Sequence, residues 1–193
     1  MARRAVGSNQ YKTRAATADS LAAGDLVAQA QNHLVGMSVG RKHMVATNPN
    51  TPAQLLVQLA HDDDGGVRLR VAENRACPLE ELERLAQDPD RSVRYSVVGR
   101  QDCPRPALAH AAQDPDTMVR MAVASNSSAH PSTLTKLAEN EMDMVRFSVA
   151  SNLNTPPQVL THLLSDPHDK TRQAAAENPS LPPEYRALQQ VTR

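Results

Sequence analysis

The chain repeats one eight-residue phrase at a fixed interval. The phrase "VRMAVASN" runs from Val119 to Asn126, and related phrases begin at Val67, Val93 and Val145, so that neighbouring copies follow a constant period of 26. A constant period of this length is typical of solenoids and other arrays in which each repeat is one small structural unit. The period therefore constrains the fold more than any other feature of the sequence.

Aligning the copies on the last residue of the phrase brings several positions into register over six copies. An Asn comes first in five of the six copies, a Pro follows four residues later in five, and a Leu follows eight residues later in five. Chance does not account for this agreement. The Asn column is Asn48, Asn74, Arg100, Asn126, Asn152 and Asn178, the Pro column is Pro52, Pro78, Pro104, Pro156 and Pro182, and the Leu column is Leu56, Leu82, Leu108, Leu134 and Leu160.

The segment after the Asn column has the pattern of a short helix. Thr51 stands where an N-cap belongs, Pro52 stands at the first helical position, and Gln54 is placed to complete a capping box. Leu56 and Leu59 then lie on one face at helical spacing. We expect this first helix of each copy to end at an Asp-Pro-Asp turn, because proline cannot continue the helical hydrogen bonds.

A second short helix carries the repeated phrase itself. Asp90 or Ser92 is placed to cap it, and Val93 and Val97 share its buried face. The Asn that follows the helix is expected to satisfy freed backbone carbonyls or to adopt a left-handed conformation. Each copy is therefore predicted to be a pair of helices.

Two short helices in a unit of this size cannot bury their own apolar faces, so the copies must stack. We predict an all-α fold, a right-handed α-solenoid of about six 26-residue two-helix repeats with an N-terminal helical cap. The predicted segments are a flexible basic tail at 1–17, a cap or degenerate repeat at 18–40, and the repeat array at 41–193.

The charge balance narrows the class of partner. The 193 residues include 21 basic and 21 acidic side chains, so the formal net charge is zero. This balance argues against a general nucleic-acid coat or a membrane-surface binder that depends on bulk positive charge. The sequence has no signal-peptide pattern and no long apolar run, so we expect a soluble, cytoplasmic protein.

The segment "VRLRVAENRACPLEELERLAQDPD", which begins at Val67, resembles the leucine-rich repeat variants, a branch of helical solenoids related to HEAT repeats. The matching elements are the VR start, the VAxN end, the later Pro, the LxxLAxD run and the DPD turn. The resemblance covers 41–193 and implies a known fold without a known function. The period of 26 is slightly longer than the usual unit. An iron–sulfur cluster known in one relative is not implied, because residues 1–40 contain no Cys.

A basic column and an acidic column follow the same period. If the basic side chains are exposed, they form a ladder suited to phosphates. The alternative, which we favour, is a structural ladder in which each Arg pairs with the Asp six residues before it and ties consecutive repeats together. The expected pairs are Asp62 with Arg68, Asp88 with Arg94, Asp114 with Arg120, and Asp166 with Arg172.

No catalytic or metal-binding constellation is apparent. Cys77 and Cys103 share one column, one repeat apart. Packed helices lie about 8–10 Å apart, whereas a disulfide needs Cα atoms within about 7 Å, so we expect two free, buried thiols. The seven His residues are scattered, and the acidic run "HDDDGG" from His61 is interpreted as a solvated turn in preference to a cation site. We therefore expect no enzyme activity and no cofactor.

The most suggestive position lies two residues after the first Val of the phrase. On a helical wheel it falls about 160° from that Val, away from the buried stripe. It is either a variable apolar strip on a concave partner-binding surface or a set of side chains that fill gaps between helix layers. This variable column consists of His43, Leu69, Tyr95, Met121, Phe147 and Gln173.

The leading hypothesis is a non-enzymatic module that binds a protein or peptide on the variable column. The first alternative is a nucleic-acid-binding solenoid, which the balanced charge weighs against. The second is a self-associating structural protein, because the C-terminal copy keeps apolar Tyr185 and Leu188. The nucleic-acid contacts expected under the first alternative are Arg3, Arg4, Lys12, Arg14, Arg41 and Lys42.

Overall fold

The computed structural model describes residues 25–30 and 34–185, and every regular element in these ranges is a helix. The chain divides into two compact units, Met1–Pro78 and Leu79–Arg193. Each is a series of two-helix repeats, which confirms the predicted all-α solenoid class. None of the described helices is both long and apolar enough to span a bilayer.

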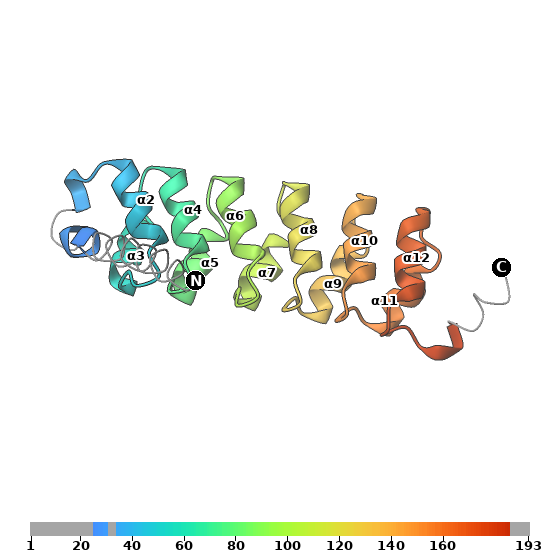
Figure 1. The fold of residues 1–193 in the computed structure, drawn as a ribbon. Helices are drawn as coiled ribbons and strands as arrows, with labels where there is room; N and C mark the ends of the chain where they lie inside the picture. Colours follow the sequence, from blue (N-terminus) through green and yellow to red (C-terminus); the bar gives the residue numbers. More distant parts are fainter. Residues whose placement is uncertain (1–24, 31–33, 186–193) are drawn as a thin grey trace, which may run out of the picture. The chain divides into compact units, whose positions relative to one another are not determined.

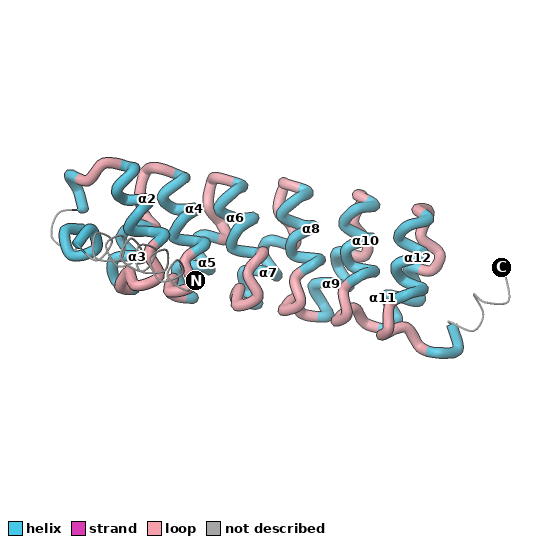
Figure 2. The backbone as a smooth tube through the Cα atoms, viewed as in Figure 1, coloured by secondary structure: helices cyan, strands magenta, loops and turns pink. Residues whose placement is uncertain are grey.

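The helices are short and alternate with tight turns (Figure 2). In the first unit, residues 25–30 are helical and are followed by η1 (Leu34–Gly36), α2 (Val39–Thr47), α3 (Ala53–Leu59) and α4 (Gly65–Glu73). The second unit contains α5 (Leu79–Leu85), α6 (Arg91–Val98), α7 (Arg105–Ala111), α8 (Thr117–Ser125), α9 (Pro131–Leu137), α10 (Asp143–Ser151), α11 (Pro157–Leu163) and α12 (Asp169–Glu177).

The second unit has two layers of helices. Figure 1 shows α6, α8, α10 and α12 side by side in one layer, with α5, α7, α9 and α11 in the other, and successive members of the even-numbered layer pack on one another. In the first unit, α2 packs on α4, and α3 contacts both. Each repeat therefore contributes one helix to each layer.

The core lies between the layers and is built from the repeated apolar positions. The first helices supply Leu and the second helices supply Val, and burying one such side chain stabilises the fold by about 1.5–3 kcal/mol. Because the core formed by the described residues contains no large aromatic side chain, the thin layers can pack closely. The fully buried members include Leu56, Leu82, Leu108, Leu134, Leu160, Val67, Val93, Val119 and Val145.

The second helices begin with an acidic cap in three repeats. The Asp90 carboxylate accepts a hydrogen bond of 2.8 Å from the Ser92 amide, as predicted for that position, and Asp64 and Asp116 cap α4 and α8 in the same way. A carboxylate at this position satisfies an amide that has no partner within the helix.

The predicted capping box at the first helix is not formed. The N-cap of α3 is Pro52, and the helix begins at Ala53 without a side-chain cap. The Thr51 hydroxyl instead donates to the carbonyl oxygen of Val45 at 2.5 Å, near the end of α2. The last carbonyls of a helix lack partners within it. The Thr position therefore closes the preceding helix and does not open the next one.

The Asn column joins consecutive repeats. Asn152 Nδ2 donates to the carbonyl oxygens of Ala124 at 2.7 Å and Asn126 at 3.0 Å, 28 and 26 residues earlier, and its Oδ1 accepts from the Asn154 amide at 2.9 Å. Its backbone is extended, with φ of −77° and ψ of 128°, so the left-handed alternative is wrong. Asn74, Asn126 and Asn178 make the same two side-chain donations.

The tail predicted at 1–17 lies outside the described residues. Within the segment predicted as a cap, 18–40, residues 25–30 are helical, with Val27 and Ala30 buried. Helix α2 already begins at Val39. Whether this segment caps the array stays a prediction.

Candidate functional site

The variable column lies on the second helices, and its members differ in exposure. In the second unit, Tyr95 is 47% exposed and Phe147 is 41% exposed, on α6 and α10. Met121 of α8 is half-buried and Gln173 of α12 is exposed. In the first unit, His43 and Leu69 are half-buried on α2 and α4.

Two further methionines extend this surface. Met118 and Met144 are each about half exposed and precede Met121 and Phe147 by three residues, so each pair shares one face of its helix. Because they recur with the same period, they form a second column beside the variable column. The variable column contains one position per repeat, so it does not reveal that the exposed apolar surface is two positions wide. We call Tyr95, Met118, Met121, Met144 and Phe147 the apolar strip.

A depression lies beside the apolar strip at α12. It has a volume of about 470 Å³ and runs from Phe147 and Ser151 of α10 to the facing side of α12. The α12 side supplies polar and charged groups, so the depression joins an apolar wall to a polar one. The α12 side and the turn after it contribute Lys170, Gln173, Ala174, Glu177, Asn178 and Pro179.

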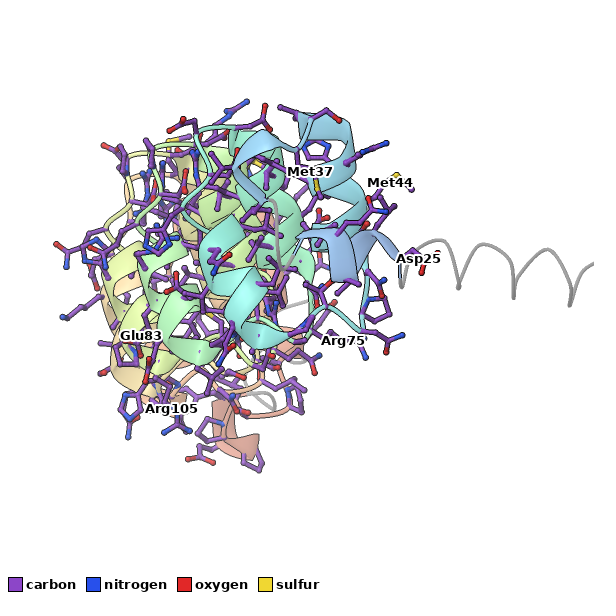
Figure 3. The ribbon with its side chains drawn as sticks, turned by 90° about the vertical axis from the view of Figure 1, so that its left-hand side faces the viewer. Asp25, Met37, Met44, Arg75, Glu83 and Arg105 are labelled. Carbon is purple, nitrogen blue, oxygen red and sulfur yellow. The ribbon has the colours of Figure 1, made fainter. Side chains whose placement is uncertain are left out.

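In the first unit the corresponding surface is more polar. His43 Nε2 lies 3.3 Å from the carboxylate of Asp64, and Arg70 Nη1 lies 2.8 Å from that of Glu73. Met44 is exposed on α2 and points away from the helices (Figure 3). Because of these charged pairs, the face that carries the variable column in the first unit is interrupted by charges, whereas the apolar strip of the second unit is not.

The basic column is engaged along the turns between repeats. Arg94 Nη1 donates to the carbonyl oxygens of Asp88 at 2.8 Å and Pro89 at 3.2 Å in its own repeat. Its Nε and Nη2 donate to the carboxylate of Asp114 at 2.7 and 2.9 Å, in the next repeat. Arg146 binds Asp166 in the same bidentate way, at 2.6 and 3.1 Å.

These contacts correct the expected pairing. The group that lies six residues before the Arg and binds it is a main-chain carbonyl, and the carboxylate partner lies 20 residues after the basic residue. Lys42 likewise pairs with Asp62 at 2.6 Å. The last Arg has no later repeat in the described residues and pairs with Asp169. The main-chain bonds at six residues join Arg68 to Asp62, Arg94 to Asp88, Arg120 to Asp114, and Arg172 to Asp166.

The two paired carboxylates stay ionised at pH values below the usual pKa of an Asp side chain. Burial alone disfavours the Asp114 carboxylate, but the hydrogen bonds from Arg94 and the Asp116 amide outweigh it and lower the pKa of Asp114. The pKa of Asp166 is lowered for the same reason, with Arg146 as the guanidinium donor. The Arg94–Asp114 and Arg146–Asp166 pairs therefore carry full charge at neutral pH.

One position lacks its carboxylate. Asn140 stands where the other repeats have Asp, and the Nε of Arg120 is buried without a hydrogen-bond partner in the described part of the chain. We predict that Asn140→Asp raises the free energy of unfolding by about 1 kcal/mol, because it supplies a charged acceptor. Urea unfolding of the full chain checks this. In an Arg120→Gln background the gain should disappear, and a gain that persists there would contradict the pairing.

Of the residues expected to contact nucleic acid, only Arg41 and Lys42 lie in the described part of the chain. Arg3, Arg4, Lys12 and Arg14 lie outside the described residues. Arg41 is exposed at the start of α2, whereas Lys42 is held by Asp62. Because the ladder side chains are hydrogen-bonded along the repeat turns, they do not form a free row of cations.

The thiols and acidic clusters have structural environments. Cys77 and Cys103 are buried and free of disulfides, and burial raises the pKa of Cys103 to about 12. In the run from His61, Asp62 binds Lys42 and Asp64 caps α4. Within 25–30 and 34–185, no group of three His, Cys, Asp or Glu side chains is placed to hold a metal ion.

Comparisons with known proteins place the chain in a family. The family model described as leucine rich repeat variant matches residues 40–64 and 65–90. A solved structure described as a leucine-rich repeat variant with a novel repetitive structural motif is 32% identical, with a TM-score of 0.63, over 82% of this chain and 68% of that chain. A crystal structure of an engineered protein is 16% identical, with a TM-score of 0.45, over 78% of this chain and 93% of that one. The comparison with curated proteins found no match. With its 26-residue repeats and this similarity over more than two thirds of a solved relative, the chain belongs to the leucine-rich repeat variant family.

Proposed function

We propose that the protein is a non-enzymatic interaction module that binds a protein or peptide on the apolar strip of its second unit. The observation that carries the proposal is the exposure of Tyr95 and Phe147, two of the four aromatic residues of the chain, on second helices whose other faces are buried. Half-exposed aromatic side chains are frequent energetic centres of interfaces. Methionines beside them adapt to varied partners.

The scaffold supports this use. The even-numbered helices are held by the buried core, the Asn column and the Arg–Asp ladder, so the side chains of the strip stand on rigid elements. Helices fixed in this way present a surface with little loss of conformational entropy on binding. The engaged ladder arginines disfavour the nucleic-acid alternative.

We predict that Tyr95→Ala with Phe147→Ala abolishes partner binding while leaving the fold intact. Each truncation at an interface centre costs about 2 kcal/mol of binding free energy, or roughly thirtyfold in affinity. The cost in unfolding free energy should stay below about 1 kcal/mol per site, because both side chains are half exposed. The full chain is used as bait in host extract, and captured proteins are quantified by mass spectrometry.

The matched control is Leu79→Ala with Leu153→Ala. Both leucines are exposed in the second unit outside the apolar strip, so this pair removes apolar side chains without touching the strip. A partner that binds the strip is lost with the first pair and kept with the second. Equal loss with both pairs, or a large loss of stability with the first, contradicts the proposal.

A further inference from the structure

The apolar strip is part of a larger surface without charge. On α6, α8 and α10, the residues of the strip and the small residues beside them are all neutral. A charged side chain placed here would lose hydration without gaining a counter-ion, which is costly. The part of a partner that covers these helices must therefore be apolar and uncharged. The small residues are Ser92, Ser96, Gly99, Ala122, Ser125 and Ser151.

The same columns become charged at α12. The column of Met118 and Met144 continues with Lys170, and the column of Met121 and Phe147 continues with Gln173. Lys170 lines the depression that begins at Phe147 and forms no ion pair among the described residues. The surface thus passes from an apolar strip to an available ammonium group within one repeat.

The carboxylates on α12 and at the start of α10 are engaged with other groups. Asp169 pairs with Arg172, and Asp143 pairs with His168 at 3.1 Å. Glu177 accepts a hydrogen bond of 2.8 Å from Gln173, at the opposite end of α12. A carboxylate brought by a partner would therefore find Lys170 as its nearest unpaired cation.

We propose that the apolar strip binds an extended, neutral, apolar peptide segment that is bordered on one side by an acidic residue, whose carboxylate pairs with Lys170. This inference rests on the proposed function and specifies the chemistry of the partner. Neighbouring packed helices lie about 8–10 Å apart, and a peptide in the extended polyproline II conformation advances about 3.1 Å per residue and returns to the same face about every three residues. One repeat therefore corresponds to about three peptide residues, with apolar side chains at every third position and the acidic residue three positions beyond the one on Phe147.

A random twelve-residue peptide library displayed on phage and selected on the full chain tests the proposal. We expect enrichment of peptides with apolar residues at a spacing of three and one Asp or Glu at the border. Selection on Lys170→Glu should replace the acidic residue with Lys or Arg. The small free energy of an exposed ion pair predicts that Lys170→Gln weakens an enriched synthetic peptide about fivefold. Lys170→Arg should retain its affinity.

The control is the same synthetic peptide with its Asp or Glu changed to the amide, which Lys170→Gln should leave unaffected. Enrichment that survives in Tyr95→Ala with Phe147→Ala, or no enrichment at all, overturns the proposed function together with this inference. Peptides that require Tyr95 and Phe147 but show no acidic border, or keep it on Lys170→Glu, overturn the inference alone.

Discussion

Replacing Asp114 with Ala is expected to lower the free energy of unfolding by about 3 kcal/mol at pH 7. The side chains of Arg94 and Asp114 are only 13% and 5% exposed, so the substitution leaves a largely buried guanidinium without its carboxylate. It also removes the acceptor for the Asp116 amide, at 2.9 Å. Urea unfolding of the full chain gives the total effect, and amide hydrogen exchange assigns it to 79–193.

The chain contains a matched control for this substitution. Asn140 occupies the same repeat position and accepts from the Met142 amide at 3.1 Å, but it has no ion pair. Asn140→Ala therefore removes the turn contact alone, and its cost should be about 1 kcal/mol. The ion pair accounts for the difference between the two variants, and equal costs would show that the pair contributes nothing.

The ion pair also makes a pH-dependent prediction. The pKa of Asp114 is lower in the folded chain than in the unfolded one, so its contribution is complete above the unfolded value of about 3.9. It is lost as the pH falls through the lowered folded pKa. The extra cost of Asp114→Ala over Asn140→Ala should therefore be constant from pH 7 to about pH 5 and shrink below pH 4.

Asn152→Ala is the second large effect, with an expected loss of about 3 kcal/mol in the free energy of unfolding. The side chain is buried, and its removal leaves the carbonyl oxygens of Ala124 and Asn126 and the amide of Asn154 without this partner. An unsatisfied buried polar group costs about 1–3 kcal/mol, partly offset by relaxation and water. Chemical unfolding of the full chain measures the loss.

Asn48 is the natural comparison for that position. It makes the same turn contact, accepting from the Asn50 amide at 2.9 Å, but its Nδ2 donates to no carbonyl in the described residues. We expect Asn48→Ala to cost less than about 1 kcal/mol. If both substitutions lower the free energy of unfolding by the same amount, the bonds between repeats do not account for the stability that the Asn column provides.

The period explains both what was predicted correctly and what was not. It led directly to two helices per repeat and a shared core, because positions such as Leu108 and Leu134 recur with it. It also concealed the ladder partner, because a carboxylate six residues before an Arg and one in the next repeat after that Arg belong to the same column. Only the three-dimensional arrangement separates the Asp114 carboxylate, which binds Arg94, from that of Asp88, whose main-chain carbonyl binds Arg94 instead.

The same ambiguity affected the Thr position. Thr51 lies between two helices, and a hydroxyl there can cap the following helix or bind the end of the preceding one. Local propensity favoured the cap, whereas the turn after α2 places the Val45 carbonyl, six residues earlier in the chain, within reach. The sequence predicted only part of the apolar strip. A helical wheel gives the direction of Tyr95 and Phe147, but it does not show which neighbours, such as Met144, stay exposed beside them.

The bonds of the Asn column and of the ladder reach only 20, 26 or 28 residues along the chain. Within each compact unit, no such contact has to close a long loop, so assembly can start at any pair of adjacent repeats and spread stepwise. Gain or loss of one whole 26-residue segment preserves every bonding register. Whole repeats can therefore be added or lost in evolution while the remaining repeats keep the same fold and the same bonds to their neighbours.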